Sequence, residues 1–186
     1  VGSDQPIFDL AAITAGINER SGLSLRGIDA RGNGQLWLHI EFEDIEQVLE
    51  RNPELSPFVS IQERAGAQTF RLSLRPALVR EAFALLGTDE MEAAEYILPP
   101  EGSGMGPDEY AEYLAWALEE YAADGDAVPV IQASMIQTRL LLPGRLRSAS
   151  PPSERRETDA VTWTISVMDV LTLEEEVEYT ARYDLD

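Results

Sequence analysis

The chain has 186 residues, of which 44% are hydrophobic and 26% charged, and its formal net charge is −20. This length is enough for one domain with its own core, and we expect a single domain over residues 1–186. The apolar runs are too short and too interrupted for a membrane span of about 20 residues. Cysteine is absent, which excludes disulfides, zinc–thiolate sites and thiol nucleophiles within this sequence.

The charge distribution is uneven. The chain has 14 arginines and no lysine. Between Arg80 and Arg139 it has thirteen carboxylates and no basic side chain. A protein with this much negative charge is repelled by the phosphate backbone of nucleic acids and by anionic lipid surfaces. We therefore expect no nucleic-acid ligand. The sequence leaves three explanations of the acidity open: a high-salt or GC-rich host, which would favour arginine over lysine, a face that meets a basic partner, and cation binding.

The first predicted elements are two strands. Residues 35–42 alternate strictly between apolar and polar side chains, which is the period of a half-buried strand. Residues 23–29 can pair with them, because the intervening Asn33-Gly34 step suits a tight turn. We therefore predict a hairpin.

A short helix and a second hairpin follow. Asp44 makes a capping-box-like start, and Asn52-Pro53 ends the helix. Residues 59–64 then turn at Gly66 into 69–74, where apolar and polar side chains again alternate. The sequence therefore predicts a helix between two hairpins.

From Pro76 the apolar spacing becomes helical. We predict one helix from Pro76 to a stop at Gly87, and a second, opened at Asp89, that ends at Pro99-Pro100. Pro107 opens a stronger helix with one acidic side and one apolar, aromatic side. These segments make a helical insertion over about 76–126.

The last third returns to strands. Residues 136–142 approach a break at Pro143-Gly144, and the polar stretch 145–159 is predicted to be a long loop. Residues 161–167 and 177–183 alternate as strands, with Val167 as the last inward residue of the first.

This order of strands, helices and strands predicts an α+β fold. Its largely antiparallel sheet comes from about 23–75 and 134–184, and the helical insertion packs on it. Residues 1–22 form an N-terminal segment that we expect to be helical over 8–20.

Three segments carry a family resemblance. They are the glycine-rich turn at 29–34, the Pro-Gly break at 141–145 and the tryptophan-bearing strand at 162–165. Together they resemble bacterial lipoproteins of the LppM-like type and their spirochaete-type relatives, over about 23–75 and 134–184. The resemblance implies an extracytoplasmic, membrane-tethered domain that handles a lipid or glycolipid and has no enzyme activity. The family's anchor cysteine is missing here, so the tether is expected only as an N-terminal lipid of the full-length protein.

Several arginines cluster near the Pro-Gly break, although the chain as a whole is strongly negative. Arginine forks recognise phosphate or carboxylate in bidentate fashion, so this loop is a candidate ligand site. The alternative is an exposed loop that balances the acidic helices of its own chain. The candidate arginines are Arg139, Arg145, Arg147, Arg155 and Arg156, accompanied by Glu154 and Glu157.

The aromatic side of the helix that begins at Pro107 is a second candidate. Tyr110, Tyr113, Trp116 and Tyr121 could line an apolar ligand groove. An aromatic stripe at helical spacing is more often core, with Trp116 the exception that we single out as a ligand contact.

The remaining candidates favour ordinary structural explanations. His39, the only histidine, shares a predicted strand face with Glu41, and such a pair can do acid–base work, but no nucleophile lies nearby in sequence. Asp124-Gly125-Asp126 begins like a calcium loop without the later glycine and glutamate. The run Glu174–Glu176 is typical of a solvated turn. We expect no catalytic residue, metal ligand or cofactor.

Two function classes lead from the sequence. The first is a non-enzymatic, lipoprotein-like extracytoplasmic domain that binds a lipid or other amphipathic envelope component, with loop arginines orienting the polar head. The second is an acidic interaction module that docks a basic protein partner through electrostatic steering. A hydrolase that uses an acid pair is the weakest alternative.

Overall fold

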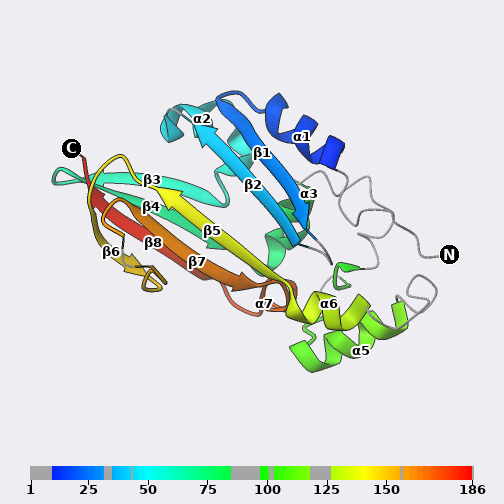
Figure 1. Ribbon diagram of the computed structural model, residues 1–186. Helices are drawn as coiled ribbons and strands as arrows, with labels where there is room; N and C mark the ends of the chain where they lie inside the picture. Colours follow the sequence, from blue (N-terminus) through cyan, green and yellow to red (C-terminus); the bar gives the residue numbers. More distant parts are fainter. Residues whose placement is uncertain are drawn as a thin grey trace.

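The computed structural model describes residues 10–31, 35–42, 44–84, 97–100, 103–117, 127–155 and 157–185. It has helices packed on antiparallel sheets, which confirms the expected α+β class (Figure 1). In chain order the elements are α1 (Leu10–Glu19), β1 (Leu23–Arg31), β2 (Gln35–Phe42), α2 (Ile45–Arg51), a 3-10 turn (Pro53–Leu55), β3 (Val59–Arg64), β4 (Ala67–Leu74), a 3-10 turn (Pro76–Leu78), α3 (Val79–Ala84), α5 (Pro107–Ala117), α6 (Ala127–Ala133), β5 (Met135–Leu141), β6 (Leu146–Ser150), β7 (Ala160–Ser166), α7 (Val167–Leu171) and β8 (Val177–Asp184).

The N-terminal hairpin is confirmed. Strands β1 and β2 pair antiparallel with a register shift between Leu25 and Gly27, and α1 lies against β1 with Ile13 and Ile17 buried. The turn predicted at 31–34 falls largely outside the described residues. Helix α2 starts as predicted, because the Asp44 carboxylate accepts hydrogen bonds from the first backbone N–H groups of the helix.

A four-stranded sheet in the order β3-β4-β8-β6 positions the site described below. The turn between β3 and β4 has positive φ at Ala65 (54°) and Gly66 (74°), as a tight hairpin turn requires, which confirms the predicted turn. Strand β8, from the end of the chain, pairs with β4 on one side and β6 on the other. Alternate residues of β4 and β8, among them Phe70 and Tyr179, therefore face a common core.

The β5–β7 pair covers the core side of this sheet, and α5 packs beside α6 near one end of that pair (Figure 1). Trp163 of β7 is buried against Tyr179 of β8, with ring centroids 5.5 Å apart, and its indole Nε1 donates to the Pro151 carbonyl. Tyr110 and Leu114 of α5 are fully buried in the same core cluster. The predicted insertion thus contributes to the core.

Three local predictions for the C-terminal third were wrong or incomplete. The stretch 145–159, predicted to be a loop, contains strand β6, which has no apolar alternation and forms by pairing with β8. Val167 does not continue β7 but begins α7, where Ser166 is the N-cap. Helix α6 was not predicted. The segments 85–96 and 118–126, which include the helix predicted from Asp89, lie outside the described residues.

A candidate anion-binding site on the four-stranded sheet

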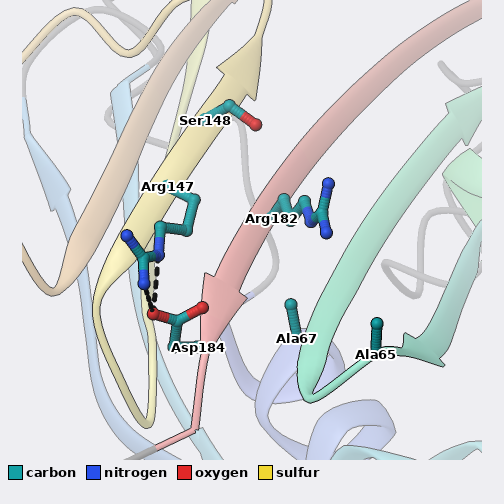
Figure 2. Close-up of a pocket in the computed structure, with 6 residues that line it drawn as sticks. All are labelled: Ala65, Ala67, Arg147, Ser148, Arg182 and Asp184. Atoms are coloured by element: carbon teal, nitrogen blue, oxygen red, sulfur yellow. Dashed lines mark hydrogen bonds and ion pairs between the residues drawn. The ribbon is translucent and has the colours of Figure 1, made fainter.

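A shallow pocket of about 300 Å³ lies where the β3–β4 turn meets β8 and β6. The register places Ala67 opposite Asp184, and small alanine side chains at this turn leave room above β8. A register shift in β6 between Leu146 and Ser148 brings the Arg147 side chain to the same place. The residues that line the pocket are Ala65, Ala67, Arg147, Ser148, Arg182 and Asp184 (Figure 2).

Arg147 and Asp184 form the fixed part of the pocket. The Arg147 Nε donates to Asp184 Oδ2 at 2.6 Å, and Arg147 Nη2 contacts the same oxygen. This hydrogen bond, followed by the charges of Arg147, Arg182 and Arg145, holds the pKa of the Asp184 carboxyl below its usual value. The same pair raises the pKa of Arg147. The carboxylate is therefore already neutralised.

Arg182 is the free cation of the pocket. It lies on β8 opposite Thr69 of β4 and Ser148 of β6, and its side chain is exposed. Figure 2 shows its guanidinium directed between β8 and β4, away from the Arg147–Asp184 pair. No hydrogen bond or ion pair joins this guanidinium to another residue in the described parts of the chain. Its donors are thus available to a ligand.

The sequence candidates are only partly brought together here. Arg147 lines the pocket, and Arg145 lies close enough for its charge to lower the pKa of Asp184, whose backbone N–H donates to the Arg145 carbonyl at 3.0 Å. Arg139 lies on β5 and donates to Glu157 Oε2 at 2.7 and 3.1 Å. Arg155 is exposed in the segment after β6 and does not line the pocket, and Arg156 is outside the described residues.

The sequence reasoning missed Arg182. The alternation of β8 was recognised and does place Arg182 on its polar side, together with Thr180 and Asp184. The alternation could not show that β6 is the strand next to β8, because β6 lies in a stretch predicted to be a loop. Without the β6–β8 pairing, nothing in the sequence joins Arg182 to Arg147.

The aromatic side of α5 is core, apart from Trp116. Tyr110 stacks on Tyr113 at 5.8 Å, and Tyr110 and Leu114 have no exposed surface. The Trp116 side chain is 73% exposed and tilts against Tyr113 with ring centroids 6.2 Å apart. Tyr110 and Leu114 are therefore enclosed by protein side chains of the core cluster, and Trp116 does not line the arginine pocket.

The other candidates stay isolated. His39 Nε2 is 3.8 Å from Glu41 Oε1 on the N-terminal hairpin, and both side chains are at least half exposed. Glu176 accepts a hydrogen bond from Arg75 at 2.7 Å, whereas Asp124 and Asp126 are outside the described residues. Within the described ranges, no three acidic, histidine or cysteine side chains are grouped so as to hold a metal, and no helix is long and apolar enough to cross a membrane.

Comparison of the chain with protein-family models, with curated proteins and with solved structures found no match.

Proposed function

We propose that this protein is a non-catalytic binding domain that holds an anionic group, a phosphate or a carboxylate, at Arg182, in the pocket that Arg147 and Ser148 also line. The observation that carries the proposal is the guanidinium of Arg182, which has no hydrogen-bond or ion-pair partner among the described residues. It lies in a pocket where Asp184, the only carboxylate among the described lining residues, is already bound to Arg147. The chain has an overall charge of −20, so anions are repelled by most of the surface. The positive charge in this pocket therefore distinguishes it from the rest of the surface.

The chemistry suits recognition rather than turnover. A guanidinium offers five N–H donors in a planar fork that matches the oxygens of phosphate or carboxylate, and it stays charged at all ordinary pH values. Ser148 adds a neutral hydroxyl at the pocket wall. Two arginines and a hydroxyl can hold and orient an anion, and we assign no bond-making step to them.

We further propose that the anion is the polar head of an amphipathic envelope component and that the domain works outside the cytoplasm. The resemblance of 23–75 and 134–184 to LppM-like lipoproteins supports this setting. The pocket adds a place for the head. An apolar tail has no place beside Tyr110 and Leu114 of α5, because both side chains are fully buried in the protein core.

The test is a titration with inorganic phosphate and with glycerol phosphate, followed by NMR of the arginine Nε–Hε resonances and by calorimetry. We expect the Arg182 resonance to shift on binding. Arg182→Ala should weaken binding by about tenfold or more, which corresponds to about 1.4 kcal/mol. Arg182→Lys keeps the charge without the fork and should recover only part of the affinity.

Arg26→Ala is the matched control, because it also removes one exposed arginine. Arg26 pairs with Glu41 at 2.7 Å on the N-terminal hairpin and does not line the pocket. If Arg26→Ala and Arg182→Ala weaken phosphate binding equally, the effect is one of net charge and the pocket is not the site.

A second function rests on a different surface. Helix α5 exposes Asp108, Glu109, Glu112 and Trp116. Glu109, Glu112 and Trp116 follow one another at three and four residues, so they share one side of the helix. This acidic stripe with an exposed indole supports the alternative proposal, an interaction module for a basic protein partner, in which carboxylates attract and the indole contacts a cationic side chain.

An oligo-arginine peptide tests the alternative by fluorescence anisotropy over a salt series. We expect affinity to fall steeply with salt, because the attraction is between exposed charges. The double variant Glu109→Gln with Glu112→Gln should bind more weakly, and Trp116→Ala should lose affinity with little change in salt dependence. Glu174→Gln with Glu175→Gln is the control of equal charge, and equal weakening by both pairs would refute a site on α5.

A further inference from the structure

The side of the four-stranded sheet that faces away from the core is polar in its described residues except for Ala67. The pairing fixes which side chains lie on this side, because antiparallel partners point the same way. We call it the outer sheet face. Its paired members are Ser60, Gln62, Arg64, Ala67, Thr69, Arg71, Ser73, Ser148, Ser150, Glu178, Thr180, Arg182 and Asp184. Arg147, which falls at the register shift of β6, is included because its side chain pairs with Asp184.

The outer sheet face is net positive. It carries four arginines and two carboxylates, so its net charge is +2 in a chain of net charge −20. Each of the two carboxylates pairs with an arginine: Glu178 accepts a hydrogen bond from Arg71 at 3.0 Å, and Asp184 accepts one from Arg147. Arg182 and Arg64 remain, and neither has a side-chain partner in the described parts of the chain.

The two free arginines lie on different strands of the outer sheet face. Arg64 pairs with Ala67, which pairs with Asp184, so Arg64 and Arg182 are two strands apart and two residues out of register. With strands about 4.8 Å apart and a rise of about 3.3 Å per residue, their Cα atoms are about 12 Å apart. The exposed guanidinium groups of both residues can therefore bind two different anionic groups of one ligand.

The rest of the outer sheet face consists mostly of small hydroxyl side chains. Ser60, Thr69, Thr180, Ser148 and Ser150 surround the arginines and can both donate and accept hydrogen bonds. No aromatic residue is among the described residues of this face, so it lacks the stacking platform on which single-stranded nucleic acids depend. Hydroxyls around fixed positive charges instead match sugar rings that carry acidic groups.

We infer that the outer sheet face binds an extended acidic glycan, a chain of sugars that bears carboxylate or phosphate groups. The inference rests on the proposed function: the glycan is the polar head of the amphipathic component, and its first acidic group occupies the pocket at Arg182. A second group of the same chain reaches Arg64, and the hydroxyl side chains contact the sugars between them. The gain over a single anion comes from linked contacts, which raise the effective concentration of the second group.

The probes are galacturonate and its oligomers of increasing length, with neutral dextran fragments and thymidine oligonucleotides of matched charge as comparators. Binding is measured by calorimetry at fixed ionic strength. We expect the affinity for oligogalacturonate to exceed that for the monomer by about tenfold or more. Arg64→Ala should abolish this gain while leaving inorganic phosphate binding unchanged, because Arg64 does not line the pocket. Arg26→Ala should leave both unchanged.

The outcomes separate the two proposals. Phosphate binding without any gain from oligomer length overturns the glycan inference and leaves the pocket intact. Failure to bind phosphate at all overturns the proposed function itself. Equal affinity for the oligonucleotides, lost on Arg64→Ala, would show a general polyanion surface and would also overturn the glycan assignment. Arg64 has no partner among the described residues, so its removal should leave folding intact, and thermal melting checks this.

Discussion

Replacing Leu114 with alanine tests whether α5 is an integral part of the core. Leu114 has no exposed surface and belongs to the core cluster that includes Trp163 of β7 and Tyr179 of β8. Trp116, two residues later on the same helix, is 73% exposed. The two positions therefore give a buried site and an exposed one within a single turn.

The expected cost follows from the burial. Truncating a fully buried leucine to alanine costs about 2–5 kcal/mol, because the lost apolar contacts are joined by a cavity that closes only partly. For a protein of this size each kcal/mol lowers the melting temperature by about 2–4 °C, so a loss of about 3 kcal/mol lowers it by about 6–12 °C. Trp116→Ala should cost about 0.5 kcal/mol or less.

Urea denaturation followed by circular dichroism measures both variants. Helix propensity is not a confounding factor, since alanine is the better helix former and acts in the opposite direction. If Leu114→Ala loses no more free energy of unfolding than Trp116→Ala, then α5 is an appended helix and the sheet folds without it.

Four further predictions concern single positions. Asn52→Ala should cost about 1–3 kcal/mol in urea denaturation, because the Asn52 Nδ2 donates to the carbonyls of Ser21 and Val48 and ties α2 to the α1–β1 connection; a negligible loss would show that water replaces both bonds. Tyr110→Phe should be neutral or stabilising, because its buried hydroxyl has no partner within the described residues; a loss as large as that of Leu114→Ala would reveal one. Gly22→Ala should lower the melting temperature more than Gly66→Ala. Both glycines have positive φ, which costs about 1–2 kcal/mol for other residues, but only at Gly22 would the new Cβ meet the Val48 side chain, at 3.1 Å. Equal losses would contradict this contact. The pKa of Asp184 is lower in the folded state, so its carboxylate stabilises the fold above the ordinary pKa of 3.8, and this stabilisation is lost as the pH falls through the folded-state pKa. Asp184→Asn should therefore flatten the acid limb of a curve of unfolding free energy against pH. An unchanged limb would contradict the pairing with Arg147.

Much of the fold was predictable because it is encoded locally. The alternation of 35–42 and 177–183, the cap at Asp44 and the turn at Gly66 each need only neighbours in the chain, and the structure confirms them. Strand β6 was missed for the opposite reason. Its residues carry little pattern, and an edge strand of this kind exists because β8 offers unpaired backbone groups.

The candidate site shows the same division. The sequence singled out Arg145 and Arg147 because they depart from the surrounding charge, and these two do lie near one carboxylate. It also grouped Arg139 with them, although β5 carries Arg139 to Glu157. Proximity along the chain was a poor guide here, since the strand that brings the free arginine, β8, begins some thirty residues after β6.

By itself the sequence determined the charge, the lack of thiol chemistry, the succession of strands and helices and the side of each strand that faces the core, because all of these depend on composition and short-range period. Only the tertiary structure decided which strands became neighbours. That choice placed β8 between β4 and β6, put Arg182 beside Arg147 and Asp184, and gathered positive charge on one face of an acidic protein. Strand order depends on burying the apolar sides of all strands and α5 together, which no local segment encodes.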